Sequence, residues 1–474
     1  MNEASCPSSP LAIRRRDLLK GAAGVAAATI LPRHVLGGSG QTAPSQKVNL
    51  AAVGVGGVGF GQVQACEKEG FQIVALCDLD DVYAKKAYDR WPQARRYKDF
   101  REMLEAEADR IDAVYCGTPD HSHAVITLAA LKRKKHVCCV KPLTRTIREC
   151  RAVTDAARRA GVATQVTADA NTSDEACRTC ELIWAGAIGD VREVHVWTNR
   201  PLWPQGMLRP EGEDPVPATF DWNLWLGPAP ARPFKDKWPA GHLAWEQIVV
   251  PARRNRGNQD ADSRARAVYH PWNFRGWWDF GTGSLGDMGC HFLNTPYRAL
   301  KLKGPSRIHA TATRVFEETA PLASIVTYDF PAREGMPPVR VVWYDGGLRP
   351  PCPQELSGQP LPEDGVLYVG ERGKMLRSKI LTPERAQKFA DVPKTLERRP
   401  GTWGEWLIAC RGGEAAGCNF ELAGPLTEFV LLGNIAIRTG VSLEWDAALS
   451  RFRDNDAANR LLHQEYRSGW TLDA

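Results

Sequence analysis

Residues 48 to 78 contain a strand, a glycine-rich turn, a helix and a second strand, in the order of a dinucleotide-binding unit. The apolar run Val48–Val53 predicts a buried parallel strand, and a Gly-x-Gly-x-x-Gly pattern starts directly after it at Gly54. Gly54 allows a tight turn, Gly56 lets the backbone approach a pyrophosphate, and Gly59 lets helix and strand pack closely. This order predicts an α/β domain with a doubly wound parallel sheet.

The second strand, Gln72 to Cys77, ends at Asp78, where an acidic residue is expected to hold the ribose 2′-hydroxyl. A carboxylate here would repel a 2′-phosphate, and no arginine follows Asp78 directly. We therefore expect NAD rather than NADP. The phosphates are expected at the N-terminus of the helix that follows the glycine turn, next to Gly57 and Val58.

The N-terminus resembles a twin-arginine export signal, which predicts a periplasmic or otherwise exported protein. Arg15 and Arg16 precede the weakly apolar stretch 21–31, and small residues near Gly37 suit a cleavage site. Residues 1–37 are therefore predicted to be a signal, with a disordered basic tail as the alternative. The rest of the chain shows no apolar run of roughly 18 residues, so no membrane span is expected after the signal is removed. Because an exported enzyme cannot exchange NADH with the cytoplasm, tightly bound NAD is expected.

Composition favours a globular enzyme and excludes a nucleic-acid binder. The chain has 474 residues, 43% of them hydrophobic and 24% charged, which predicts two domains. Residues 1–37 have five Arg or Lys against two acidic residues, so they supply +3 of the net charge of +6. The 13 cysteines do not form a disulfide framework. Cys177 and Cys180 are a redox pair, half a zinc site or, as we favour, part of a helix face, and no metal site is predicted.

Strands and helices alternate through the first domain, residues 38–167. Its later elements are predicted as helices at 82–89, 99–106, 125–132 and 147–160 and strands at 113–116, 136–140 and 162–166. In such sheets ligands bind beyond the carboxyl ends of the strands. Two of the loops found there contain polar residues, at 117–123 and at 141–144.

These loops resemble those of the glucose-fructose oxidoreductase, inositol dehydrogenase and rhizopine-catabolism (Gfo/Idh/MocA) family. The family's T-P-x-H-x-H loop, which lines the ribose and nicotinamide, matches residues 118–123, and the resemblance makes Thr118, Pro119, His121 and His123 cofactor-binding residues. The alternative for the two histidines is a metal pair. The family's E-K-P loop brings a catalytic lysine to the reacting centre and corresponds to Val140-Lys141-Pro142, with valine in place of glutamate. The resemblance therefore makes Lys141 and Pro142 site residues. Without the resemblance, two interpretations of Lys141 stay open. It is a surface lysine, or, because it directly follows a parallel strand, it faces the ligand-binding crevice.

The second domain, residues 168–474, is predicted to contain helices and an open, mostly antiparallel sheet. Strands are expected at 191–197, 307–315, 324–329, 339–344 and 365–370, and helices at 177–184, 402–409 and 427–438. Residues 206–267 have little periodicity, and they form either a cover over the substrate or an interface arm.

A second catalytic motif lies at residues 283–291. Ser284 can cap a helix that runs to about Leu300, which places Asp287 and His291 one turn apart on one face. An aspartate in this position can orient a histidine and tune its basicity. The same family carries G-x-x-x-D-x-x-x-H on the helix that faces the nicotinamide, where the histidine works with the lysine. The resemblance therefore implies catalytic roles for Asp287 and His291.

Aromatic and hydrogen-bonding residues around this motif suggest a sugar, polyol or glycoside as substrate. Flat apolar rings suit the C–H faces of sugars, although tryptophan is equally a core residue. The candidate substrate-binding residues are Trp197, Arg200, Trp203, His270, Asn273, Arg275 and Trp277.

The sequence therefore predicts an NAD-dependent oxidoreductase that acts on CH–OH groups. The family resemblance further implies a homo-oligomer. Lys141 or His291 would take the proton of a secondary alcohol while its hydride passes to the nicotinamide. The first alternative is redox-assisted glycoside cleavage, in which a transient ketone permits elimination and is then reduced. The second is a carbohydrate-binding protein that has kept the fold and lost the chemistry.

Overall fold

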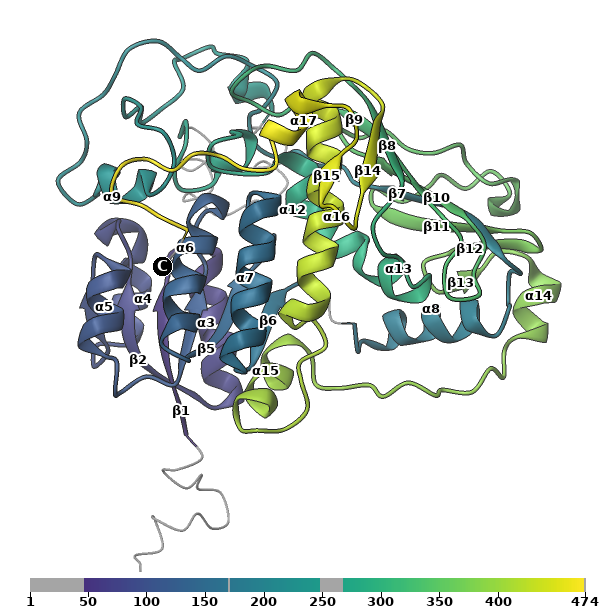
Figure 1. Ribbon diagram of the computed structural model, residues 1–474, viewed down its shortest axis with the longest axis horizontal. Helices are drawn as coiled ribbons and strands as arrows, with labels where there is room; N and C mark the ends of the chain where they lie inside the picture. Colours follow the sequence, from purple (N-terminus) through teal and green to yellow (C-terminus); the bar gives the residue numbers. More distant parts are fainter. Residues whose placement is uncertain (1–46, 169–170, 248–266, 473–474) are drawn as a thin grey trace, which may run out of the picture. The chain divides into compact units, whose positions relative to one another are not determined.

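The first of two β-sheets contains six parallel strands and forms the N-terminal part of the protein (Figure 1). The computed structural model describes residues 47–168, 171–247 and 267–472. The strand order is β3-β2-β1-β4-β5-β6. Their bounds are β1 Val48–Val53, β2 Phe71–Cys77, β3 Arg95–Tyr97, β4 Ala113–Cys116, β5 His136–Val140 and β6 Thr164–Thr167. The order reverses between β1 and β4, so the loops after these strands flank a crevice where ligands bind in such sheets.

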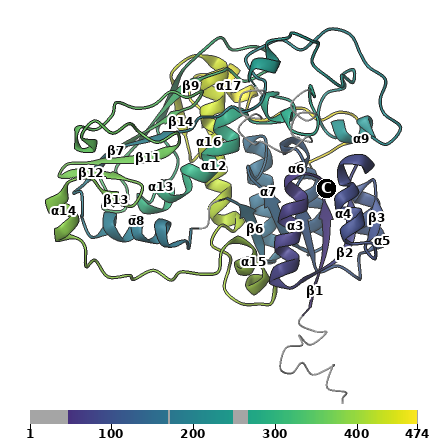
Figure 2. The same cartoon turned by 180° about the vertical axis from the view of Figure 1, so that it is seen from behind.

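Helices cover both faces of this sheet because its strands are apolar on both sides. From β1, Ala51 and Val53 pack toward α5 (Phe100–Ala106), α6 (Asp120–Lys132) and α7 (Ile147–Ala160). Leu50 and Ala52 pack toward α3 (Val58–Glu69), α4 (Asp81–Arg90) and α15 (Thr402–Cys410). Figure 2 shows α3 and α15 on the face opposite to α6 and α7. The C-terminal part of the chain therefore supplies one of the helices of the N-terminal layer.

The second sheet has nine strands in the order β13-β12-β11-β7-β10-β9-β8-β14-β15, and only the pairing of β10 with β7 is parallel among those described. The strands are β7 Val191–Trp197, β8 Arg307–Ala312, β9 Ser324–Phe330, β10 Val339–Tyr344, β11 Gly365–Gly370, β12 Gly373–Leu376, β13 Lys379–Ile380, β14 Leu443–Asp446 and β15 Arg451–Phe452. The remaining helices are α8 Asp174–Trp184, α9 Trp222–Leu226, η2 Asn273–Gly276, α12 Gly283–Phe292, α13 Asn294–Ala299, η3 Gln354–Leu356, α14 Pro383–Lys388, α16 Phe420–Thr439 and α17 Asp456–Arg460. Residues of α8, α12 and α16 share one apolar core with this sheet.

The predicted fold class is confirmed, a parallel sheet with helices followed by a mostly antiparallel sheet. The sequence missed β3, β12, β13, β14 and β15, which are so short that pairing with a neighbour decides their conformation. It also began α16 too late, since the helix starts at Phe420 and contains Pro425. Burial of Phe420, Ala423 and Leu426 outweighs the unfavourable proline.

One described helix, α16, is long and apolar enough to cross a membrane, judged by its length and composition alone. The expectation that no stretch of this kind follows the N-terminal segment is therefore wrong. Its most apolar window has a mean hydropathy of 1.3 and is 78% buried within the fold. Such burial is typical of a core helix. The segment predicted as an export signal lies outside the described residues.

Candidate active site

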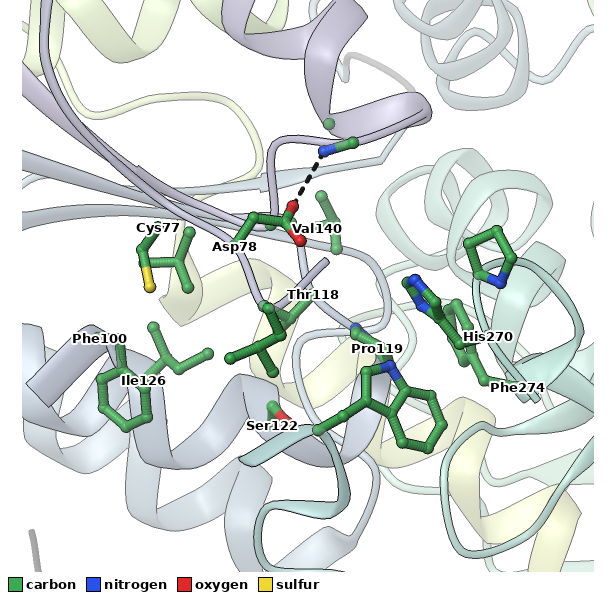
Figure 3. A pocket seen from close by; sticks show the side chains of 18 of the residues that line it. Cys77, Asp78, Phe100, Thr118, Pro119, Ser122, Ile126, Val140, His270 and Phe274 are labelled. Atoms are coloured by element: carbon green, nitrogen blue, oxygen red, sulfur yellow. Dashed lines mark hydrogen bonds between the residues drawn. The ribbon is translucent and has the colours of Figure 1, made fainter. Parts of the chain in front are cut away.

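A long cavity lies at the carboxyl ends of β1, β4 and β5 (Figure 3). Its empty space, open mouth included, is about 1200 Å³. Of the predicted cofactor residues, its lining contains Gly54, Gly56, Val58, Gly59, Asp78, Thr118, Pro119 and Lys141. Gly57 and Pro142 adjoin the lining in sequence. In Figure 3, Phe100 and Ile126 lie on one side of the cavity and His270 and Phe274 on the other.

Two glycines of the turn are required by the fold itself. Gly54 has φ +77°, and a Cβ there would lie 2.6 Å from the carbonyl oxygen of Gly117. A Cβ on Gly59 would lie 2.1 Å from the carbonyl oxygen of Gly54. The turn can therefore bring β1 and α3 together only with glycine at these two positions, as predicted.

Asp78 lies beside this turn, where its carboxylate accepts hydrogen bonds from the backbone. The amides of Val55 and Gly56 donate to Oδ2 over 2.8 and 3.2 Å, and the amide of Asp80 donates to Oδ1 over 3.1 Å. Burial raises the pKa of Asp78, while the amides of Asp80 and Val55 oppose this shift. Asp78 therefore fixes the turn and lines the cavity where the ribose is expected.

The ring of Tyr83, from α4, packs against the turn on the side predicted for the pyrophosphate. A Cβ on Gly56 would lie 2.1 Å from Tyr83 Cδ1, and one on Gly57 would lie 1.8 Å from the Tyr83 hydroxyl. In this conformation the Tyr83 ring therefore occupies the space that side chains at Gly56 and Gly57 would fill. A pyrophosphate would fit against Gly56 after rotation of the tyrosine ring.

His121 and His123 do not belong to the lining of the cavity, and their role as cofactor contacts stays a prediction. Both are fully buried. The ring nitrogens of His121 face the carbonyl oxygens of Phe280 and Trp225, and those of His123 face the carbonyl oxygens of Pro142 and Thr118. Burial lowers the pKa of His121 to about 4. The two histidines therefore join the loops around the site.

The sulfur atoms of Cys116 and Cys139 and one ring nitrogen of His123 lie within 4.8 Å of one another. Both nitrogens of His123 face carbonyl oxygens at 2.8 Å, and a neutral imidazole can donate only one of these two hydrogen bonds. Cys177 and Cys180 are buried in α8, and the Cys177 thiol donates to the carbonyl oxygens of Asn171 and Glu397. These contacts support the interpretation that Cys177 and Cys180 pack on a helix face.

Lys141, after β5, contacts Asp287 on α12 and so joins the two halves of the site. Its Nζ donates to Asp287 Oδ1 over 2.6 Å and to the Asp287 carbonyl oxygen over 2.8 Å. Arg275 Nε donates to the same Oδ1 over 2.8 Å. The three side chains are only 11–15% exposed. Burial alone would raise the pKa of Asp287, but the two cations outweigh it and hold that pKa well below its usual range.

Asp287 was predicted to orient His291, whereas the structure commits its Oδ1 to Lys141 and Arg275. His291 is half-buried in the last turn of α12 and is not in the cavity lining. The helix also differs from the prediction, because it begins at Gly283, ends at Phe292 and is followed by the separate helix α13. Ser284 lies inside its first turn, and Thr282 stands at the cap and donates to Asp120 Oδ2.

Of the predicted substrate residues, His270 and Arg275 line the cavity. His270 lies 3.1 Å from Asp80 and stacks on Phe220, and Arg275 lies over the ring of Trp272. The other five candidates do not line it, and their role in substrate binding stays a prediction: Trp197, Arg200, Trp203, Asn273 and Trp277. The three indoles and Asn273 are almost fully buried, and their N–H groups donate to internal oxygens. Arg200 bonds to its neighbour Asn199. Internal packing therefore explains them.

The described part of the 206–267 segment covers the cavity, which supports the first of its two interpretations. The amide of Asp221 donates to the carbonyl oxygen of Leu79, and the amide of Asp81 donates to that of Thr219. These bonds attach the segment to the loop after β2, and Trp225 of α9 lines the cavity. The segment therefore closes the site from the side opposite the sheet.

Sequence reasoning missed Trp470, which the C-terminal segment brings to the cavity. In Figure 1 this segment runs past α9 and ends beside α4 and α6. Arg467 fixes it by donating to the carbonyl oxygens of Gly227 and Asn223, and Trp470 packs near Phe100. Only the three-dimensional contact identifies this residue, because nothing in the local sequence marks it.

Comparison with known proteins agrees with this geometry. Residues 48–168 match the Gfo/Idh/MocA model, described as an oxidoreductase family with an NAD-binding Rossmann fold. The α-N-acetylgalactosaminidase of Shewanella oneidensis is 27% identical over 205 residues, which cover 38% of this chain and 44% of that protein. A glycosyl hydrolase family 109 protein of Shewanella baltica is 28% identical over 206 residues, with the same coverage. The chain thus spans less than half the length of these curated relatives.

Solved structures share the fold of both sheets. The WlbA dehydrogenase of Bordetella pertussis, in complex with NADH and UDP-GlcNAcA, superposes with a TM-score of 0.54 and 15% identity, covering 84% of this chain and 99% of that one. The Chromobacterium violaceum WlbA dehydrogenase gives a TM-score of 0.56 with 14% identity, covering 85% and 96%. Residues 48–168 are therefore similar to the NAD-binding Rossmann domain of the Gfo/Idh/MocA oxidoreductase family.

Proposed function

We propose that this protein is an NAD-dependent oxidoreductase that acts on a secondary alcohol of a sugar, polyol or glycoside. The observation that carries the proposal is the position of Lys141. Its ammonium lines the same cavity as the glycine turn and is fixed by two hydrogen bonds to Asp287. A proton-transfer group is thus held next to the site expected for a nicotinamide.

The residues present fit NAD. Gly54, Gly59 and Asp78 form the predicted turn, and the cavity continues from them to Lys141. When bound, NAD supplies a hydride acceptor, and in reduced form a hydride donor, at the substrate carbon. Asp78 would hold the ribose, and Thr118 and Pro119 would line the other side.

Lys141 would exchange a proton with the substrate oxygen at which the C–O bond changes order. Lys141 would donate this proton when a ketone is reduced and accept it when an alcohol is oxidised. Arg275 contacts the other side of Asp287 and lines the cavity, where its remaining donors can bind substrate hydroxyls. Whether His291 shares the proton transfer remains a prediction from the motif.

A second candidate function is redox-assisted glycoside cleavage, and the names of the curated relatives favour it. These relatives are glycosidases, yet the matched residues of this chain include an NAD-binding domain. Oxidation of a substrate alcohol to a transient ketone would acidify the neighbouring C–H bond, so a base could remove that proton while the aglycone leaves with its oxygen. Water would then add across the resulting double bond, and return of the hydride from NADH would restore the alcohol. The reaction breaks a glycosidic bond without net redox change.

The decisive experiment is to denature the purified protein, identify any released nucleotide, and then follow NADH absorbance and products with a panel of sugars and glycosides. An oxidised sugar with intact glycosidic bond supports the first function, and a free aglycone supports the second. Lys141→Ala should bind NAD and lose most turnover in either case. A protein that neither contains nor takes up NAD would contradict both and favour a carbohydrate-binding protein.

We further propose that the protein is exported with its cofactor bound and that it forms a homo-oligomer. The support for export is the Arg15-Arg16 motif ahead of an apolar stretch. Fractionation of cells with and without the twin-arginine translocase tests it, because retention in the cytoplasm of both strains would contradict export. Light scattering during size-exclusion chromatography tests the oligomer.

A further inference from the structure

A second hollow, separate from the cofactor cavity, is lined by cationic side chains from different parts of the fold. Arg145 precedes α7, Arg438 lies in the last turn of α16, and His463 lies in the C-terminal segment. Thr282, which caps α12, completes the wall. This hollow shares none of its lining residues with the cavity that contains Lys141.

Arg145 is buried with part of its guanidinium unpaired. The residue is 8% exposed, and one terminal nitrogen donates to the carbonyl oxygen of Trp278 over 2.9 Å. Its Nε is buried and has no hydrogen-bond partner. Leaving a buried charged donor unpaired is costly, so a ligand that accepts this hydrogen bond would bind favourably.

Arg438 places a second guanidinium on the same hollow. It lies 5.4 Å above the ring of Trp278, and among the described residues it has neither a hydrogen bond nor an ion pair. Arg438 is exposed to solvent along part of its side chain, and desolvation of the remainder, followed by the nearby Arg145 cation, lowers its pKa. The two arginines therefore repel each other, and an anion between them would relieve that repulsion.

His463 adds a further free donor. Its Nδ1 is buried without a partner in the described structure. Burial, followed by the charge of Arg148, lowers the pKa of His463. Protonation of the ring is thus disfavoured by the same positive surroundings, which an anion would neutralise.

Two nearby carboxylates, Asp279 and Glu149, offset part of the positive charge, since they oppose the lowering of the pKa of Arg438 and of His463 respectively. Asp279 bonds to Arg232 and to Gln464. Glu149 accepts hydrogen bonds from the Tyr466 hydroxyl and from the backbone amides at the start of α7. The hollow therefore presents positive charge that is only partly offset, together with two buried nitrogen atoms, Arg145 Nε and His463 Nδ1, that have no hydrogen-bond partner in the described structure.

We propose that this hollow binds a small oxyanion, a phosphate, sulfate or carboxylate group, between Arg145, Arg438 and His463. The planar guanidinium groups suit two-point bonding to such anions. Bound there, the anion would connect α7, α16, the C-terminal segment and the start of α12, the helix of Asp287. It would therefore stabilise the folded enzyme.

The test is titration of the intact purified protein with inorganic phosphate, sulfate or acetate in separate experiments, by calorimetry and thermal unfolding, against sodium chloride at matched ionic strength. Phosphate or sulfate binding ahead of acetate would indicate a tetrahedral oxyanion, and the reverse a carboxylate. We expect saturable binding and a rise in Tm beyond that in chloride, because a ligand of the native state stabilises it.

Arg438→Gln should weaken binding at least about tenfold, as expected for the loss of a charge-assisted contact. Its matched control is Arg314→Gln, which removes an exposed arginine that likewise lies over an aromatic ring, Phe316. His463→Gln provides a second variant that keeps both arginines. The proposal is overturned if no anion exceeds the chloride effect, or if Arg438→Gln and Arg314→Gln bind the anion equally.

Discussion

Replacement of Asp287 by asparagine tests the central contact of the candidate active site. The carboxylate contacts Lys141 and Arg275 through the same oxygen, at 2.6 and 2.8 Å. Asparagine keeps the size of the side chain and removes its charge. Two largely buried cations would then face each other without a counter-ion.

The cost can be estimated from the geometry. Two unit charges about 5 Å apart repel by about 3 kcal/mol at an effective dielectric constant of about 20. Removal of one partner from a buried ion pair typically costs about 3–5 kcal/mol, because the remaining charge stays desolvated. We expect Asp287→Asn to lower the free energy of unfolding by this amount, and to reduce turnover because Lys141 loses its fixed position.

Urea unfolding, followed by circular dichroism at neutral pH, measures the effect. The double variant Asp287→Asn/Arg275→Gln should recover most of the lost stability, since it removes one of the repelling cations. The control is Asp89→Asn, which breaks an exposed ion pair with Lys85 and should cost less than about 1 kcal/mol. If Asp287→Asn costs no more than Asp89→Asn, or if the double variant is less stable than Asp287→Asn, the electrostatic reasoning is refuted.

Three further predictions concern the cofactor and pH. Trp470→Ala should weaken NAD binding by about 5- to 150-fold, the usual range for loss of base stacking, as measured by calorimetry; unchanged affinity would place the adenine elsewhere. Tyr83→Ala should speed NAD association in stopped-flow fluorescence, because the ring packs against Gly56, and an unchanged rate would show that the ring does not obstruct entry. Burial raises the pKa of Asp345 to about 7, so between pH about 4 and 7 the folded state holds a proton that the unfolded state has lost, and stability falls by about 1.4 kcal/mol per pH unit from this group. Asp345→Asn should remove this pH dependence of the free energy of unfolding, as measured by urea unfolding between pH about 4 and 7. If the free energy of unfolding changes with pH equally in the variant and the original protein, the raised pKa is contradicted.

Local pattern was sufficient to predict the elements whose side chains repeat with a clear period. The strands at Ala113–Cys116 and Val339–Tyr344 match residue for residue, because both are apolar runs bounded by turns. The glycine turn was equally predictable, since Gly54 and Gly59 are demanded by contacts within the same unit. The short strand Arg95–Tyr97 was not, because only pairing with β2 makes it a strand.

The sequence identified Lys141, Asp287 and Arg275 as candidate site residues, but it did not predict that they contact one another. The sequence places Asp287 and His291 on one helical face, but it does not show that Lys141 and Arg275 meet the carboxylate first. It cannot distinguish a histidine that faces a ligand from His121, whose nitrogens face carbonyl oxygens far away in the chain. Such pairings depend on tertiary contacts.

Enclosure of the cavity explains how the cofactor could be retained even though Val140 replaces the glutamate of the family motif. The Rossmann unit alone would leave the cavity open on the side opposite the sheet. Here Trp225 covers it from the segment after β7, and Trp470 covers it from the C-terminus. Backbone hydrogen bonds from Asp81 and Asp221 attach the first cover to the loop after β2. Release of NAD would require both covers to move, so retention depends on segments outside the dinucleotide motif, as a protein exported with its cofactor would need.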